Sequence, residues 1–290
     1  MMIGPFPGPV TGQSSANKLL RDGLLERGHI VSFIDTKGSD LKDYRGHGHL
    51  DIRKLIESFS NISKYLRNGF GKGSILYLTP GQSLLGYLRY LPIIILGRII
   101  GQKIVLHFHG AQILDTYKGS NLLFKGLISV ISNAANKLVV LGPSLVCMFP
   151  FVKDSRKLVV CYNGVLETDA AKYDEVQDKI STQPDNSEIR ILYCSNLIKS
   201  KGVIDLIKAI SLLVEEGYSV SCDIAGVLPK SLESEFYTNF EKIRIHCTFH
   251  GPTYGRYKRD LFHKNHIFCL PTYYPTEGQP IAILEAYANG

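Results

Sequence analysis

The sequence lacks the cysteine spacings that mark a metal site or a disulfide framework. Its six cysteines are scattered along 290 residues, and no two of them form a C-x-x-C pair. Most lie in apolar runs that are typical of strands, where a thiol behaves as a small hydrophobic side chain. We therefore expect a protein of a reducing compartment that carries no zinc and, from a start of Met-Met-Ile-Gly, has no secretory signal peptide.

The sequence also lacks an apolar run of the roughly 20 residues that a membrane span needs. The best candidate, residues 84–100, contains Arg89, Arg98 and a central Pro92. Basic residues on an apolar helix are typical of an element that lies in a membrane surface. They are equally typical of a core helix whose arginines extend into solvent. Both interpretations stay open at this point.

Acidic residues are scarce in the first part of the chain. Residues 1–170 contain 20 lysines and arginines against 11 aspartates and glutamates, whereas residues 171–290 contain 13 against 15. A uniformly basic protein would suggest nucleic acid as its partner. A one-sided positive charge instead favours an anionic lipid surface or a phosphorylated acceptor, and we expect no nucleic acid.

The glycine fingerprint of dinucleotide-binding folds, G-x-G-x-x-G, is missing, so a nicotinamide dehydrogenase is a weak alternative. The first loop, residues 3–12, is instead rich in glycine and proline and precedes a helix expected from about Ser14 to Arg27. Ser14 or Ser15 can cap this helix. The loop backbone, with Gly12 at its end, can approach an anion at the helix N-terminus.

Short apolar runs alternate with helical patterns along the chain, which predicts an α/β protein with parallel sheets. A polar segment, residues 167–187, has no convincing apolar period and is typical of a linker. We therefore expect a first domain over residues 1–166 and a second over 188–290. The expected strands are residues 30–34, 75–78, 104–108, 137–141, 157–162, 190–195, 219–225, 243–249 and 267–270, and expected helices include 52–67 and 84–100.

Candidate binding groups concentrate in the last stretch of the sequence, after the strand at 267–270. Glu277 lies in a loop, and Glu285 lies about a turn and a half into a helix that begins near Pro280. Carboxylates accept hydrogen bonds from hydroxyls, and amides of the first turn, from Gly278 to Ile281, can hold phosphate oxygens. Taken singly, each glutamate is more commonly structural, because Glu near a helix N-terminus complements the helix dipole.

Taken together, these residues resemble a known pattern. Glu277-Gly278, Pro280, Leu284-Glu285-Ala286 and Gly290 resemble the E-x7-E segment of the family 4 retaining glycosyltransferases, which have the GT-B fold. Residues 195–203, S-N-L-x-x-x-K-G-V, are similar to the G-R-L-x-x-x-K-G-V motif of that family. His109, at the end of an expected strand and before a glycine, is similar to a functional histidine of the family, with His107 in support.

The resemblance implies two Rossmann-like α/β domains that face each other across a cleft. It implies transfer of a sugar, with retention and without metal or cofactor, from a UDP- or GDP-sugar to a saccharide or lipid-linked acceptor in cell-surface polysaccharide or glycolipid synthesis. From the cysteine usage and the charge asymmetry, rather than from the resemblance, we expect a cytoplasmic protein that is peripheral at the inner face of an anionic membrane. The implied catalytic residues are His109 and Glu277, and the implied donor-binding residues are Gly12, Asn196, Lys201, Gly202, Gly278, Pro280, Ile281 and Glu285.

The sequence departs from the family pattern in two places. Asn196 stands where an arginine commonly binds phosphate, so either the affinity for the donor is lower or a neighbour such as Lys199 compensates for the missing charge. In the family the chain continues beyond the position of Gly290, so we expect the second domain to be incomplete. The alternative function is therefore a truncated, non-catalytic remnant that binds a nucleotide sugar.

Overall fold

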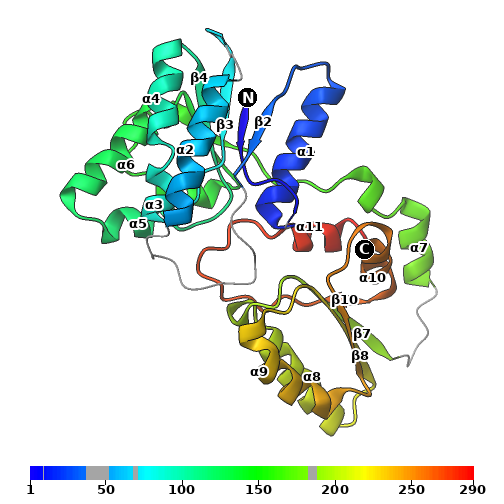
Figure 1. Ribbon diagram of the computed structural model, residues 1–290. Coiled ribbons are helices and arrows are strands. Elements are labelled where there is room, and N and C mark those ends of the chain that lie inside the picture. Colours follow the sequence, from blue (N-terminus) through cyan, green and yellow to red (C-terminus); the bar gives the residue numbers. More distant parts are fainter. Residues whose placement is uncertain (9, 37–51, 68–70, 182–187) are drawn as a thin grey trace. The chain divides into compact units, whose positions relative to one another are not determined.

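The computed structural model describes residues 1–8, 10–36, 52–67, 71–181 and 188–290, and of residues 52–59 it describes the backbone alone (Figure 1). The chain forms two compact units. Unit 1 consists of Met1–Asn163 and Pro275–Gln279, and unit 2 consists of Gly164–Tyr274 and Pro280–Gly290. Each unit is described by itself below.

Unit 1 is built on a parallel sheet, as the alternation of apolar runs and helices predicts. Within the described residues its strand order is β2-β1-β3-β4-β5-β6, and every neighbouring pair is parallel. The strands are β1 (Met2–Gly4), β2 (Phe33–Asp35), β3 (Ile75–Leu78), β4 (Lys103–Phe108), β5 (Lys137–Val140) and β6 (Leu158–Val160). Their carboxyl ends therefore lie along one edge, where ligands of such sheets bind.

Helices cover both faces of this sheet. Figure 1 shows α1 on one side and α2, α4 and α6 on the other. Buried side chains of the strands and helices form one core, and the hydroxyl of buried Tyr87 is satisfied by Ser132 at 2.8 Å. The helices are α1 (Gly12–Glu26), α2 (Ile52–Arg67), α3 (Leu84–Leu88), α4 (Leu91–Ile100), α5 (Ile113–Gly119) and α6 (Leu122–Ala134), with 3₁₀ turns at Pro143–Met148 and Ser155–Lys157.

The prediction of one helix over residues 84–100 is wrong, because the segment forms two helices, α3 and α4. The break lies at residues 89–90, two positions before Pro92, since proline has no amide proton and its ring clashes with the preceding turn. One face of α4 lies in the core with Ile93 and Ile94, while Ile95 and Ile99 on the other face are 49% and 76% exposed. Among the described residues, no helix is long and apolar enough to cross a membrane.

Unit 2 has a second parallel sheet, with strand order β10-β7-β8-β9 among the described residues. Alternate residues of β7 enter different cores: Tyr193 packs in the cluster that contains Ile207 and Phe236, and Leu192 in the cluster that contains Phe262. The elements are α7 (Tyr173–Ser181), β7 (Ile189–Cys194), α8 (Val203–Glu215), β8 (Val220–Ala225), α9 (Lys230–Phe240), β9 (Cys247–Gly251), α10 (Gly255–Lys264), β10 (Ile267–Phe268) and α11 (Ile281–Tyr287), with 3₁₀ turns at Glu167–Asp169, Lys199–Lys201 and Glu241–Ile243.

Several expected boundaries differ from the structure. The segment expected as a linker, with or without a helical turn, residues 167–187, contains the nine-residue helix α7; residues 182–187 lie outside the described part of the chain. The last strand ends at Phe268 rather than Leu270, and Ile267 on it is 48% exposed because β10 is the outermost described strand. The first helix is capped by Thr11 instead of Ser14 or Ser15, since Thr11 and Ser14 form a reciprocal capping box.

The backbone at the end of β8 predicts which glycine unit 2 tolerates least. Gly226 has φ +148°, and a Cβ there would overlap the carbonyl oxygen of Ser195 at the end of β7. Gly217 also has a positive φ, +87°, but a Cβ there meets no atom within 4 Å. We expect Gly226→Ala to lower the free energy of unfolding by about 3 kcal/mol or more, from strain plus overlap.

The matched control is Gly217→Ala, which adds backbone strain without a steric overlap. It should lower the free energy of unfolding by about 1 kcal/mol. Urea-induced unfolding, monitored by a spectroscopic probe in unit 2, measures the free energy of unfolding of both variants. Equal losses for the two variants would show that β7 and β8 do not approach each other as described.

Candidate functional site

The carboxyl end of β4 carries the two histidines that the sequence analysis singled out. The rings of His107 and His109 are 4.1 Å apart between centroids, so the two side chains do lie on the same side of the strand, as their spacing predicts. The intervening Phe108 is fully buried in the core. On the neighbouring strand β3, the hydroxyl of Tyr77 shares a 2.5 Å hydrogen bond with Nδ1 of His107.

Both histidines are neutral at physiological pH. Burial lowers the pKa of His107 to about 4, and burial together with the nearby His107 lowers the pKa of His109 well below its usual value. Both ring nitrogens of His109 are buried and have no hydrogen-bond partner within the described residues. A neutral imidazole carries one donor and one acceptor. His109 therefore keeps a donor and an acceptor that no described group uses, and it adds no charge.

Residues 275–279, which the sequence analysis placed in the second domain, belong to unit 1 and pair with the end of β4. The Ala111 amide donates to the Thr276 carbonyl at 3.2 Å, and Gly110 forms an antiparallel bridge with Glu277. A Cβ on Gly278 would lie 2.5 Å from the carbonyl oxygen of His109, so glycine is required for this approach. The structure thus brings Glu277 and Gly278 to His109.

A second anchor for this loop is Asn163, which follows β6. Its amide donates to Oε1 of Gln279 at 2.7 Å, and its side-chain amide donates to the Gln279 carbonyl at 3.0 Å. From the sequence, Asn163-Gly164 predicts only a tight turn. The residues are 116 positions apart, so no local pattern could reveal this pairing.

Gly12 opens α1, near the amino-terminal loop of unit 1. That loop packs closely, since Asn17 of α1 donates to the Pro5 carbonyl and to the Thr79 hydroxyl, both at 2.9 Å. The capping box already uses the amides of Thr11 and Ser14. The helix end therefore offers an anion fewer donors than the sequence suggests.

In unit 2, the Lys201–Gly202 turn follows the end of β7. Gly202 has φ +77°, and a Cβ there would overlap the carbonyl oxygen of Pro271. The Tyr273 amide donates to the Ser200 carbonyl at 2.9 Å, and Nζ of Lys201 lies 5.8 Å from the centroid of the Tyr274 ring. The segment after β10 therefore packs directly on the Lys–Gly turn.

Lys199, the neighbour suggested as a substitute for the missing arginine, forms an ion pair in this structure. Lys199 is bound to Glu235 of α9, with Nζ at 2.8 and 2.9 Å from the two carboxylate oxygens. Its side chain is 64% exposed, so this is a surface ion pair. Asn196 is half-buried after β7, and its carbonyl accepts a hydrogen bond from the Tyr193 hydroxyl at 3.3 Å.

Glu285 lies on α11, as predicted, and is paired with a residue that the sequence analysis did not place in the site. Lys258 of α10 donates to both oxygens of Glu285 at 2.6 Å. Pro280 is the N-cap of α11 and Ile281 its first residue. Because proline has no amide proton, the expected run of donors from Gly278 to Ile281 is interrupted at Pro280.

The structure sorts the candidate residues between the two units. His109, Glu277, Gly278 and Gly12 belong to unit 1, and Asn196, Lys201, Gly202, Pro280, Ile281 and Glu285 belong to unit 2. Across the described parts of the chain, no group of three or more His, Cys, Asp or Glu side chains is placed to hold a metal ion.

The sequence was also compared with known protein families. Residues 174–290, which lie almost entirely in unit 2, match the family model of glycosyl transferases group 1. This segment contains Lys201, Glu277 and Glu285. A search of curated proteins finds no match.

Solved structures resemble the chain over nearly all of its length. A glycosyltransferase from Rickettsia africae has a TM-score of 0.67 and 16% identity, with 99% of this chain and 76% of that chain covered. HepE from Anabaena, in complex with UDP and glucose, has a TM-score of 0.64 and 14% identity, with 99% of this chain and 78% of HepE covered. WaaG, a glycosyltransferase involved in lipopolysaccharide biosynthesis, has a TM-score of 0.66 and 13% identity, with 100% of this chain and 79% of WaaG covered.

These likenesses establish the fold. The solved structures are glycosyltransferases of the GT-B fold, and the prediction of a GT-B-like α/β protein with parallel sheets is confirmed. The chain is thus similar in fold to GT-B glycosyltransferases throughout, and in sequence to group 1 glycosyl transferases over residues 174–290.

Proposed function

We propose that the protein is a retaining, metal-independent glycosyltransferase that moves a hexose from a nucleotide sugar to an acceptor hydroxyl. The observation that carries the proposal is the match of residues 174–290 to group 1 glycosyl transferases, because this segment holds Lys201, Glu277 and Glu285. The E-x7-E spacing of the two glutamates, typical of family 4, is the reason for proposing retention.

The donor diphosphate would bind at the carboxyl edge of the unit 2 sheet. In the reaction, the bond between the anomeric carbon and a phosphate oxygen breaks, and the acceptor oxygen bonds to that carbon while its proton passes to the departing diphosphate. Negative charge therefore develops on the diphosphate as the bond breaks. Lys201 and the backbone around Gly202 are the groups there that can stabilise this charge. Glu285 would accept hydrogen bonds from the ribose hydroxyls.

The sugar would bind to the groups that unit 1 assembles at the end of β4. Glu277 can accept hydrogen bonds from sugar hydroxyls, and the neutral ring of His109 can donate one and accept one. A neutral histidine is suited to a neutral sugar, because it orients hydroxyls without attracting a competing anion. Much of the rate would come from holding donor and acceptor in one geometry.

The nucleotide is proposed to be UDP or GDP. HepE, which shares the fold, was solved with UDP and with UDP-glucose, and starch synthase IV from Arabidopsis thaliana with ADP. Each of these ligands contains a nucleoside diphosphate. They support a nucleoside diphosphate as the group that this fold recognises.

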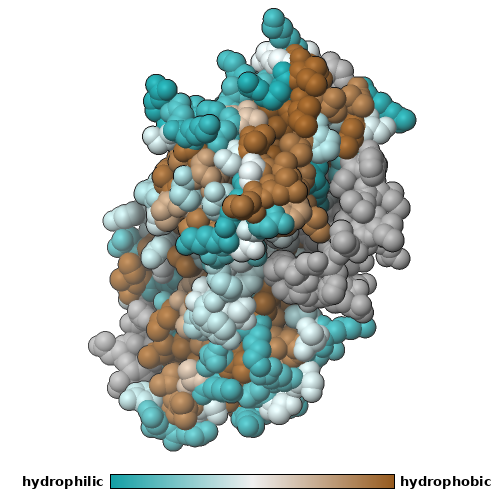
Figure 2. All heavy atoms as spheres, turned by 90° about the vertical axis from the view of Figure 1, so that its left-hand side faces the viewer, coloured by the Kyte–Doolittle hydropathy of each residue, from teal (hydrophilic) through white to brown (hydrophobic). Residues whose placement is uncertain are grey.

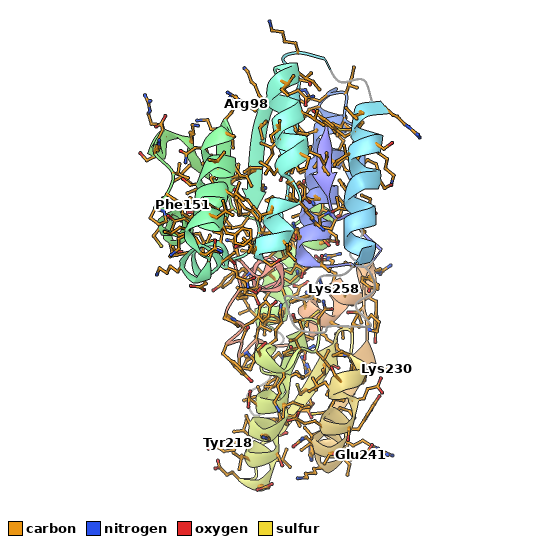
Figure 3. All side chains as sticks on the ribbon, turned by 60° about the vertical axis from the view of Figure 1, so that its left-hand side comes forward. Arg98, Phe151, Tyr218, Lys230, Glu241 and Lys258 are labelled. Carbon is orange, nitrogen blue, oxygen red and sulfur yellow. The ribbon has the colours of Figure 1, made fainter. Side chains whose placement is uncertain are left out.

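The acceptor is proposed to be lipid-linked and reached from an anionic, cytoplasmic membrane surface. Figure 2 shows hydrophobic residues gathered in a band on the side of unit 1 where α4 and α6 lie. The exposed members on α4 and α6, which pack together, are Ile95, Ile99, Leu122, Leu123 and Val130. Residues 58–153 contain ten lysines and arginines but one acidic residue, and Figure 3 labels one of these, Arg98, near the end of α4.

One observation favours the alternative of a non-catalytic nucleotide-sugar binder. Asn196 carries no charge, and Lys199, the expected substitute, is bound to Glu235. Weaker stabilisation of the diphosphate charge would lower the transfer rate more than the affinity for the donor, because much of that charge develops during bond cleavage.

Donor binding and transfer test the proposal directly. We expect titration calorimetry to show binding of UDP or GDP and no binding of NAD. With the corresponding nucleotide sugar, Glu277→Ala should lower the transfer rate at least about a hundredfold, because the sugar loses a charged hydrogen-bond acceptor close to the reacting centre.

The matched control is Glu26→Ala, which removes an exposed carboxylate of the same unit at the end of α1 and should leave transfer unchanged. Binding of NAD with neither UDP nor GDP would contradict the proposal. Diphosphate binding without any transfer or donor hydrolysis by the unaltered protein would instead establish the non-catalytic alternative.

Liposome sedimentation tests the membrane surface. We expect binding to vesicles that contain anionic phospholipid and little binding to neutral vesicles. The double change Ile95→Glu and Ile99→Glu should lower the bound fraction about tenfold or more, because it replaces two exposed apolar side chains of α4 by charges of the same sign as the lipid.

Ile30→Glu is the control, since Ile30 is 96% exposed in unit 1 but lies on neither α4 nor α6. It should bind vesicles as the unaltered protein does. Binding that ignores anionic lipid content, or equal losses in the two variants, would count against this surface.

A further inference from the structure

We infer that Lys258 is a positioning residue that orients the Glu285 carboxylate to accept both hydroxyls of a ribose, so that the site selects ribonucleotides over 2′-deoxyribonucleotides. The inference rests on the proposed function and adds to it a residue of α10 that no motif indicates.

The geometry of the pair supports this role. Nζ of Lys258 lies 2.6 Å from each oxygen of Glu285, so the cation bridges the carboxylate symmetrically. The side chains are 28% and 13% exposed, whereas both partners of the Lys199–Glu235 pair are more than a third exposed. A bridged and mostly buried carboxylate has little freedom to rotate. The side chains of an exposed ion pair keep that freedom.

The remaining hydrogen-bonding capacity of Glu285 matches a vicinal diol. An ionised carboxylate offers about four acceptor positions, two on each oxygen. Lys258 takes one on each oxygen, which leaves one on each for a ligand. Two hydroxyls on neighbouring ribose carbons present two donors at a similar separation. Without the lysine, the carboxylate could rotate and lose this paired arrangement.

The surroundings place the pair next to the proposed donor site. Cys194, the last residue of β7 and two positions before Asn196, is influenced electrostatically by both Lys258 and Glu285. Burial raises the pKa of the Cys194 thiol to about 11, so the thiol stays neutral and does not compete with Glu285 for the lysine. The carboxyl edge of β7 is therefore where the pair acts.

A simpler role must be separated from this one, namely that Lys258 only ties α10 to α11. The chain offers a matched control on the same helix. Lys264 pairs with Asp223 at 2.8 Å, and that carboxylate is 12% exposed, close to the 13% of Glu285. Lys264→Met therefore removes an ion pair of a similarly buried carboxylate away from Glu285, although Asp223 keeps its hydrogen bonds to His250 and Asn265.

The experiment measures the affinities of UDP and 2′-deoxy-UDP (or the guanosine pair, if GDP is the ligand bound) by calorimetry. The unaltered protein should bind the ribonucleotide about tenfold tighter, the value of one hydrogen bond to a charged acceptor. Lys258→Met should lose this preference because its affinity for the ribonucleotide falls while its affinity for the deoxyribonucleotide stays the same. Lys258→Arg, which keeps a bidentate donor, should restore most of it, and Lys264→Met should keep it in full.

Three outcomes overturn the inference. Unchanged affinities for both nucleotides in Lys258→Met show that the lysine does not orient Glu285. Equal weakening of both nucleotides in Lys258→Met shows a purely structural tie. If the unaltered protein binds no nucleoside diphosphate, the proposed function fails and this inference fails with it, whereas the first two outcomes leave the proposed function standing.

Discussion

The account depends on a short backbone pairing between the end of β4 and residues 275–279. Gly110 bridges to Glu277, and the Ala111 amide donates to the Thr276 carbonyl. Glycine at 278 permits this approach, because a side chain there would meet the carbonyl of His109. Through this pairing the backbone of Glu277, distant in the sequence, lies beside the strand end that carries His107 and His109. Backbone hydrogen bonds thus fix the position of the loop.

Unit 2 follows the same design with different chemistry. Its parallel strands end along one edge, where the Lys201–Gly202 turn packs under the segment after β10. Two helices that are not adjacent in sequence, α10 and α11, contribute the Lys258–Glu285 pair beside the end of β7. Unit 1 thus offers neutral rings and a carboxylate for hydroxyls, and unit 2 offers a cation and a braced carboxylate.

The sequence predicts local structure well and distant contacts poorly. β3 and α2 have the expected bounds, because an apolar run and a helical period are local signals. The single helix expected over 84–100 failed because hydrophobicity alone does not show that Pro92 breaks the backbone pattern. The Asn163–Gln279, Gly110–Glu277 and Lys258–Glu285 contacts join residues far apart in sequence, and nothing in their local patterns names the partner. Lys199 is a further case, because no local pattern indicates that its ion-pair partner, Glu235, lies on α9.

Hydrogen exchange at the Ala111 amide tests the central claim most directly, since that proton is given to the Thr276 carbonyl at 3.2 Å. The account predicts exchange far slower than in an unstructured peptide, and loss of that protection in Gly278→Ala, where a Cβ would lie 2.5 Å from the His109 carbonyl oxygen. An Ala111 amide that exchanges as fast in the unaltered protein as in an unfolded chain would show that the loop does not hold Glu277 against His109.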